Sequence, residues 1–326
     1  MEILMPAVMV VFGLTLLAGG GEALVRAATR IARVLGVTPA VIGLTVVAMG
    51  TSVPELVVSL FAALRGQPEI AISNVVGSNI FNIAAALGIT ALITPLPVHG
   101  NAVKLEWPFM FAASLACLII ARDGVVDRLE GGAFLIALAL FIAYTVRIAR
   151  RDVDADEIQE FSDEVASRDF DGDDATTRPR LRVTLGVLAA GIVGLVIGGR
   201  FLVDGAVDIA RIAGMTERQI GLTVVAGGTG APELATSVMA ALRGRTDVAV
   251  ANMIGSNIFN VLGILGMTAL ITPVAVSAAI ISSDMWWMIG MSVLLLPLLH
   301  SGLRLTRIEG GVLLSSYVLY LALLLH

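Results

Sequence analysis

Long apolar stretches follow one another along the whole chain, separated by short polar segments. A membrane-spanning helix needs roughly 17 to 25 predominantly apolar residues. The stretches do not alternate polar and apolar residues, as the strands of a membrane barrel do. The pattern therefore predicts ten transmembrane helices, which begin near Leu4, Pro39, Ile70, Pro108, Leu129, Leu181, Ile220, Val248, Ile280 and Ile308.

Composition agrees with this pattern. Hydrophobic residues make up 57% of the 326 residues, charged residues only 14%, and the mean hydropathy is +0.92. A soluble chain of this length could not bury so much apolar surface, so we expect an all-α integral membrane protein surrounded by lipid. The single cysteine, Cys117, rules out a disulfide within the chain. The three histidines lie apart at segment ends, which argues against a transition-metal site. We expect no cofactor and no nucleic-acid partner.

The chain contains the same segment twice. Gly43–Gly66 and Gly221–Gly244 are identical at 17 of 24 aligned positions, and the same offset of 178 residues aligns Ser78–Asn82 with Ser256–Asn260. Each half is therefore one five-helix unit, residues 1–150 and residues 181–326. Because five is odd, the second unit enters the membrane from the opposite side, which predicts an inverted repeat. Glycines predict close packing of the first helix of each half: Gly19, Gly20 and Gly21 in the first, and Gly198 and Gly199, which match Gly20 and Gly21, in the second.

Charge supports opposite orientations of the two halves. The positions equivalent to Glu22, Arg26 and Arg30 are Arg200, Asp204 and Asp208, so the signs are exchanged. Arginine and lysine favour cytoplasmic segments. With the N-terminus outside the cytoplasm, 15 of the 21 Lys and Arg residues lie on cytoplasmic segments. We therefore predict a multi-pass protein of the cell's inner (plasma) membrane with both termini outside the cytoplasm.

The segment that joins the halves, residues 151–180, carries eleven acidic and four basic residues. Such charge runs usually stay solvated and disordered, so we interpret it as a cytoplasmic linker. Asp169, Asp171 and Asp173 resemble the start of a calcium-binding loop, and a weak regulatory cation site is the alternative interpretation. However, Asp174 and Arg180 stand where such a loop needs Gly and Glu.

Each copy of the repeated segment places a glutamate beside a proline within an apolar helix: Glu55 after Pro54, and Glu233 after Pro232. Both features are costly inside a membrane, because proline removes a helical hydrogen bond and a carboxylate must be desolvated. A gap in a helix is tolerated at this depth only where it faces protein or a watery cavity. Because both copies of the segment place a glutamate beside a helix break, we predict a cation site between the two halves.

The residues near these glutamates supply oxygen atoms only. Thr51 shares a helix face with Glu55, and Ser78 shares one with Asn82. The second half repeats the set as Thr229, Glu233, Ser256 and Asn260. Calcium and sodium prefer such oxygen ligands. Two carboxylates without a cation repel each other, so one Ca²⁺, or Na⁺ or protons in its place, would balance them. That competition predicts exchange.

At these residues the chain resembles the cation/calcium exchanger superfamily, specifically the prokaryotic sodium/calcium exchangers. The similar motifs are GTSVPE at Gly50–Glu55, GTGAPE at Gly228–Glu233, and GSNIFN at Gly77–Asn82 and at Gly255–Asn260. The resemblance implies that Glu55 and Glu233 are the main calcium ligands, together with the backbone carbonyls of Thr51 and Thr229. It also implies sodium sites and a central lining formed by Ser52, Ser78, Ser256, the carbonyls of Ala48 and Ala226, Asn82 and Asn260. The first helix of each half would slide to alternate access.

One position departs from the family pattern. The second copy has Gly230 where the first has Ser52, so one expected sodium ligand is missing. Asparagine rather than aspartate at Asn82 and Asn260 disfavours potassium co-transport by the same resemblance.

A secondary antiporter that exchanges Ca²⁺ for Na⁺ is the leading hypothesis. A proton/calcium exchanger is the nearest alternative, although Thr51, Ser52 and Thr229 differ from the signature of that family. A passive cation channel is another. An intramembrane hydrolase that uses Glu55 and Glu233 as acid and base is disfavoured, because the two glutamates have similar surroundings whereas an acid and a base need different ones.

Overall fold

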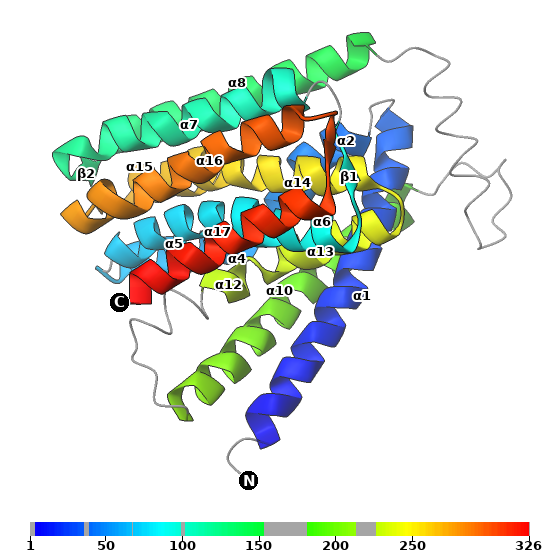
Figure 1. The fold of residues 1–326 in the computed structure, drawn as a ribbon, viewed down its shortest axis with the longest axis horizontal. Helices are drawn as coiled ribbons and strands as arrows, with labels where there is room; N and C mark the ends of the chain where they lie inside the picture. Colours follow the sequence, from blue (N-terminus) through cyan, green and yellow to red (C-terminus); the bar gives the residue numbers. More distant parts are fainter. Residues whose placement is uncertain are drawn as a thin grey trace, which may run out of the picture.

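The protein is described here from a computed structural model, for residues 4–35, 39–66, 68–98, 102–152, 181–212 and 226–325 (Figure 1). The first half contains α1 (Leu4–Leu35), α2 (Pro39–Ile42), the π-helix η1 (Gly43–Val47), α3 (Ala48–Thr51), α4 (Val53–Leu64), α5 (Pro68–Ile80), the π-helix η2 (Phe81–Ala86), α6 (Leu87–Ile93), strand β1 (Leu96–Pro97), the π-helix η3 (Ala102–Glu106), α7 (Trp107–Ile120), the 3₁₀-helix η4 (Ala121–Asp123), β2 (Val125–Val126) and α8 (Arg128–Asp152).

Within its described residues the second half repeats this order, except for the 3₁₀-helix η4, which has no counterpart there. It contains α10 (Leu181–Ile212), α12 (Ala226–Thr229), α13 (Ala231–Leu242), α14 (Thr246–Ile258), the π-helix η6 (Phe259–Leu265), α15 (Gly266–Ile271), β3 (Val274–Ala275), the π-helix η7 (Ile280–Asp284), α16 (Met285–His300), β4 (Arg304–Leu305) and α17 (Arg307–Leu325). The linker prediction falls mainly on residues 153–180, which lie outside the described residues.

Among the described residues, eight helices are long and apolar enough to cross a membrane. A ninth span consists of Gly43–Thr51 and Val53–Leu64, which meet at an angle of 50°. The tenth expected span begins near Ile220, and residues 213–225 lie outside the described part of the chain. The prediction of an all-helical membrane protein is therefore confirmed.

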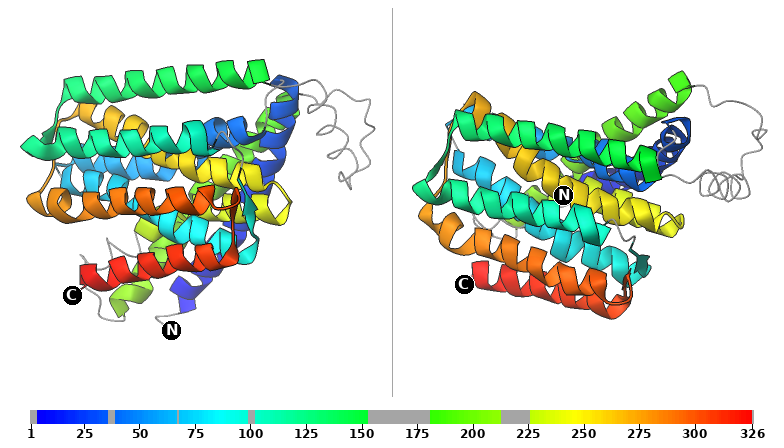
Figure 2. Two further views of the ribbon diagram at one scale, coloured as in Figure 1. Left: turned by 45° about the horizontal axis from the view of Figure 1, so that its top comes forward. Right: turned by 90° about the horizontal axis from the view of Figure 1, so that it is seen from above.

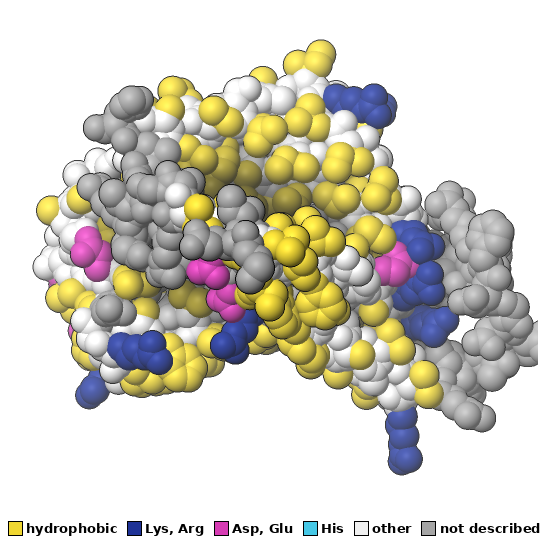
Figure 3. All heavy atoms as spheres, turned by 90° about the horizontal axis from the view of Figure 1, so that it is seen from below, with side chains coloured by type: hydrophobic (Ala, Val, Ile, Leu, Met, Phe, Trp, Pro, Cys, Tyr) yellow, Lys and Arg dark blue, Asp and Glu magenta, His cyan; other side chains and the backbone are white. Residues whose placement is uncertain are grey.

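Two spans form the centre of the molecule. In Pro68–Ile93, 78% of the most apolar window is buried within the protein, and in Thr246–Ile271 83% is, whereas the other six of the eight long helices reach at most 39%. Both central spans pass from an α-helix into a π-helix and back. The outer helices expose apolar side chains such as Phe12, Ile136 and Val193, as a lipid-facing surface requires. Figure 3 shows one such face, with hydrophobic side chains across it and many of the arginines and lysines toward its margins.

Two small antiparallel sheets join the halves. β1 pairs with β4, and β2 pairs with β3. The repeat relates β1 to β3 and β2 to β4, so it exchanges one sheet for the other. Figure 1 places β1 and β2 at opposite ends of the helix bundle. An operation that exchanges the two ends of the bundle is what an inverted repeat requires.

Helices α1 and α10 cross each other and are inclined to most of the other long helices (Figures 1 and 2). Glycines permit this close contact. A Cβ atom added at Gly20 would lie 2.9 Å from the carbonyl oxygen of Gly191, and one added at Gly13 would lie 2.7 Å from that of Gly198. The predicted packing role is therefore confirmed for Gly20 and Gly198. It is wrong for Gly19, which has no such neighbour within 4 Å in the described part of the chain.

The two halves depart from symmetry where α1 and α10 meet the helices that carry the glutamates. α1 packs along α13, with Gly21 against Ala235 and Thr236. Gly199, the repeat partner of Gly21, instead faces Pro232 of its own half. The matching face of α4 remains uncovered, since Val57 and Phe61 are 45% and 54% exposed.

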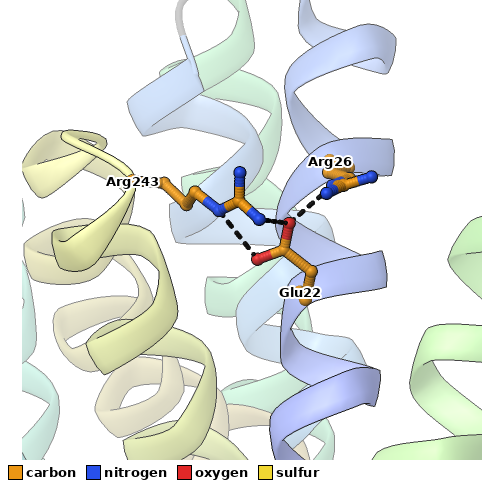
Figure 4. Close-up of polar contacts among 3 residues, drawn as sticks. All are labelled: Glu22, Arg26 and Arg243. Atoms are coloured by element: carbon orange, nitrogen blue, oxygen red, sulfur yellow. Dashed lines mark hydrogen bonds and ion pairs between the residues drawn. The ribbon is translucent and has the colours of Figure 1, made fainter. Parts of the chain in front are cut away.

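An ion pair joins α1 to the end of α13. Glu22 of α1 accepts hydrogen bonds from Arg243, one of them 3.0 Å long from Nε, and one of 2.5 Å from Arg26 (Figure 4). At the equivalent place in the other half, Arg200 of α10 contacts Asp204 of the same helix at 3.7 Å. The side of α13, which α1 covers, and the side of α4, which stays uncovered, therefore differ in charge as well as in packing.

Candidate cation site

Each glutamate lies just after a break in its helix. Ser52 separates α3 from α4, and Gly230 separates α12 from α13. The prolines fall in the first turn of the following helix, where a missing N–H costs little. Glu55 and Glu233 stand in the same first turn, where the unpaired N–H groups of a helix favour negative charge. The break predicted from sequence is confirmed, and it places both carboxylates near helix N-termini.

The two carboxylates are buried and close to each other. Glu55 is 1% exposed and Glu233 0%, and they lie near enough to repel. Ser52 Oγ of the first half donates a hydrogen bond of 2.7 Å to Glu233 Oε1. The Thr229 side chain of the second half interacts with Glu55. Within the described chain, neither carboxylate forms an ion pair with a basic side chain. The negative charge is thus left without a protein counter-ion there.

Six buried oxygen atoms in this region have no hydrogen-bond partner of good geometry among the described residues. They form two sets of three at matched positions: Glu55 Oε2, Ser78 Oγ and Asn82 Oδ1, and Glu233 Oε2, Ser256 Oγ and Asn260 Oδ1. Proteins rarely bury polar atoms without partners. The helices that carry them pack together, α5 beside α4 and α12, and α14 beside α13 and α3. A hard cation would satisfy these atoms, because it prefers oxygen ligands.

The threonine hydroxyls make bonds between the halves. Thr51 Oγ1 donates to Asn252 Oδ1, and Thr229 Oγ1 donates to Asn74 Oδ1, each over 3.4 Å. Asn74 Nδ2 in turn donates to the backbone carbonyl of Glu55 over 3.1 Å, and Asn252 Nδ2 to that of Glu233 over 3.4 Å. Each asparagine therefore ties a glutamate of its own half to a threonine of the other.

Sequence reasoning did not single out these asparagines. Asn74 and Asn252 are related by the same 178-residue offset as the glutamates, and so are their partners Ser59 and Ser237. A search of the repeat for every retained polar residue would have found them.

Of the two backbone carbonyls expected to bind sodium, that of Ala48 already accepts hydrogen bonds from the protein. The carbonyl of Ala48 accepts a hydrogen bond of 3.1 Å from the amide of Ser52, and it lies 3.3 Å from Thr51 Oγ1, whose single hydrogen it shares with Asn252 Oδ1. A cation at this oxygen would compete with the threonine hydroxyl. Ala226 is the first residue of α12.

The sequence and fold are similar to those of known proteins. Residues 5–147 and 183–326 match the family described as sodium/calcium exchanger protein. The putative antiporter CaxA of Alkalimonas amylolytica is 36% identical over 324 residues, which cover 98% of this chain and 99% of that protein. The inner membrane protein YrbG of Escherichia coli K12 is 33% identical over 322 residues, 98% of this chain and 97% of that protein.

A solved structure has the same fold. It is the sodium-calcium exchanger NCX_Mj soaked with 10 mM Na⁺ and zero Ca²⁺. The two structures superpose with a TM-score of 0.81 at 30% sequence identity, over 98% of this chain and 99% of the other. The similarity thus extends over nearly the full length of both chains.

Proposed function

The chain belongs to the sodium/calcium exchanger family, and within it we propose that this protein is a secondary active antiporter that exchanges Ca²⁺ for Na⁺ by alternating access. The family consists of membrane cation transporters rather than enzymes. The observation that carries the proposal is the buried pair Glu55 and Glu233, together with matched buried serine and asparagine oxygens that have no hydrogen-bond partner among the described residues.

We assign the residues as follows. Glu55 and Glu233 bind calcium, together with the backbone carbonyls of Thr51 and Thr229. Sodium binds at the flanks of this site, and its ligands come from Ser52, Ser78, Ser256 and the carbonyls of Ala48 and Ala226. Asn82 and Asn260 line the centre through side-chain oxygens that have no hydrogen-bond partner among the described residues.

Charge balance supports exchange. Two carboxylates close together in a medium of low dielectric repel strongly, so the empty site is unfavourable. One Ca²⁺ neutralises both carboxylates, and Na⁺ ions entering in its place do the same. If the site can switch between facing one side of the membrane and facing the other only when its charge is neutralised, the movement of one ion is coupled to that of the other.

The proposal is tested by calcium flux into vesicles that contain the purified protein. Sodium, potassium and proton gradients are imposed one at a time. We expect calcium uptake to follow the sodium gradient alone. Uptake that follows the proton gradient would instead make the protein a proton/calcium exchanger. Uptake that needs no opposing gradient would make it a passive channel.

The site is tested by Glu55→Gln and Glu233→Gln, which remove one negative charge at nearly constant shape. We expect both variants to lose calcium uptake. Glu69→Gln is the matched control, because Glu69 is an exposed residue in the first turn of α5. Uptake at the unaltered rate in either site variant would exclude this site.

For the arrangement in the membrane, we propose that residues 1–150 and 181–326 are the two inverted units and that residues 151–180 form a cytoplasmic linker. Both termini then lie outside the cytoplasm of a cell whose inner membrane holds the protein. The relative YrbG is named an inner membrane protein. Single cysteines replacing Arg30 and Arg151 test this in a Cys117→Ser background. If both cysteines were labelled only from outside the cell, the orientation in the membrane would be the reverse of the one proposed.

A further inference from the structure

Four buried asparagines connect the two central spans. Asn79 and Asn82 lie where α5 passes into η2, and Asn257 and Asn260 lie where α14 passes into η6. Asn82 Nδ2 donates to Asn257 Oδ1 over 3.1 Å. Asn260 Nδ2 donates to Asn79 Oδ1 over the same distance. Both bonds cross from one half to the other, and each is the repeat image of the other.

These bonds determine which end of each site amide is free. With their nitrogens bound to the other half, Asn82 and Asn260 keep Oδ1 buried and without a donor among the described residues. A side-chain amide has a donor end and an acceptor end. If Asn260 were turned over, its oxygen would face Asn79 Oδ1, and its NH₂ group would take the place of the free acceptor. A cation is attracted by the first orientation and repelled by the second.

The orientation of Asn79 and Asn257 is itself determined by their neighbours. Asn79 Nδ2 donates to the backbone carbonyl of Asn257 over 3.3 Å and lies 3.6 Å from Met288 Sδ. Asn257 Nδ2 lies 3.5 Å from Met110 Sδ. Sulfur and carbonyl oxygen accept hydrogen bonds, so both sets of neighbours favour the NH₂ end. The Oδ1 atom of each residue is then left to receive the donor from the opposite half.

We propose that Asn79 and Asn257 are positioning residues for the transported cation. Asn79 holds the amide of Asn260, and Asn257 holds the amide of Asn82, so that the oxygens of Asn82 and Asn260 face the ion. The inference rests on the proposed role of this site in cation transport. Asn79 and Asn257 do not contact the ion in this proposal, and each orients one asparagine of the other half.

A double-mutant cycle separates positioning from general packing. A carboxylate has two equivalent oxygens, so it needs no partner to turn it toward the ion. Calcium affinity is measured by equilibrium titration of the purified protein in detergent. We expect Asn79→Ala to weaken calcium binding about five- to tenfold, the effect of one lost hydrogen bond and a misdirected dipole. In an Asn260→Asp background, the same substitution should change the affinity less than about twofold.

The matched control exchanges the partners. Asn257→Ala should weaken binding in the Asn260→Asp background as it does in the unaltered protein, because Asn257 holds Asn82 instead. Asn82→Asp should rescue Asn257→Ala but not Asn79→Ala. Equal losses in all backgrounds would show that the asparagines serve packing alone and would overturn the proposal.

A variant that does not purify as a folded protein is replaced by Asn79→Ser or Asn257→Ser, whose shorter hydroxyl cannot hold the distant amide in the same way. The cycle reads calcium binding rather than transport, so it remains decisive if vesicle flux shows no sodium coupling. Failure of the flux experiment would overturn the proposed exchange, and additive losses in the cycle would overturn only the positioning role.

Discussion

Ser52 Oγ donates a hydrogen bond of 2.7 Å to the carboxylate of Glu233, a residue of the opposite half. The repeat partner of Ser52 is Gly230, which has no side chain, so Glu55 lacks the equivalent hydroxyl. The two carboxylates therefore share a site in which only one is bound by a serine. This difference occurs within motifs that are otherwise closely similar, and sodium should be sensitive to it, because a hydroxyl is a ligand that sodium can use.

Gly230→Ser should restore the missing hydroxyl. The backbone at Gly230 has φ −80° and ψ 0°, which any residue can adopt. We expect the apparent affinity for sodium to rise about fivefold, from about 1 kcal/mol for one added hydrogen bond or ligand contact. The measurement is the sodium dependence of calcium flux from vesicles. Ser52→Ala, which removes the existing hydroxyl, should shift it in the opposite direction. An unchanged sodium dependence in both variants would show that neither position affects coupling.

Asn252→Ala should destabilise the protein. Asn252 is fully buried and takes part in hydrogen bonds with Glu233, Ser237 and Thr51. Hydrogen bonds between membrane helices average about 0.6 kcal/mol, so the loss should be about 2 kcal/mol. Thermal unfolding in detergent measures it. Ser237→Ala removes one of these three bonds and should cost less than about 1 kcal/mol. Equal melting temperatures for the two variants would contradict the cross-half role of Asn252.

Glu22→Gln should loosen the contact between α1 and α13. It removes the charge that Arg26 and Arg243 share, which is worth roughly 1 kcal/mol for a partly exposed pair. A cysteine replacing Ala235, in a Cys117→Ser background, reports the opening because α1 covers this position at Gly21. We expect its labelling to become about fivefold faster. Glu69→Gln is the control and should leave the rate unchanged.

Arg200→Glu should stabilise the opposite arrangement, in which α10 covers α4. The repeat relates Glu22 to Arg200 and Arg243 to Arg65, so closing the second side as the first is closed would bring two arginines together. The introduced carboxylate would meet Arg65 instead, much as Glu22 meets Arg243. A cysteine replacing Val57, now 45% exposed, should then be labelled more slowly. Arg182→Glu makes the same charge change at the start of α10. Equal slowing by both variants would mean that the effect is not local to Arg65.

Much of the candidate site could be predicted from the sequence, because its unfavourable features each arise from one residue and its immediate neighbours in the chain. Proline removes a hydrogen bond wherever it stands in a helix, and a carboxylate in an apolar segment needs a partner. Glu55 and Glu233 follow from these rules, and the break before each of them is present in the structure. The partners of Thr51 and Thr229 could not be predicted, because each hydrogen bond joins residues more than 150 positions apart.

The amino-acid pattern establishes a helical membrane protein with two related halves, since hydrophobic length and internal repetition are properties of the chain alone. It also determined that each half supplies one carboxylate. The three-dimensional packing was needed to show that α1 covers α13 while the matching face of α4 stays exposed. The repeat places matched glycines and matched glutamate-bearing helices in both halves, so it does not by itself select the covered side. The choice between them is made collectively by the contacts of the whole bundle, and the ion pair between Glu22 and Arg243 is one of those contacts.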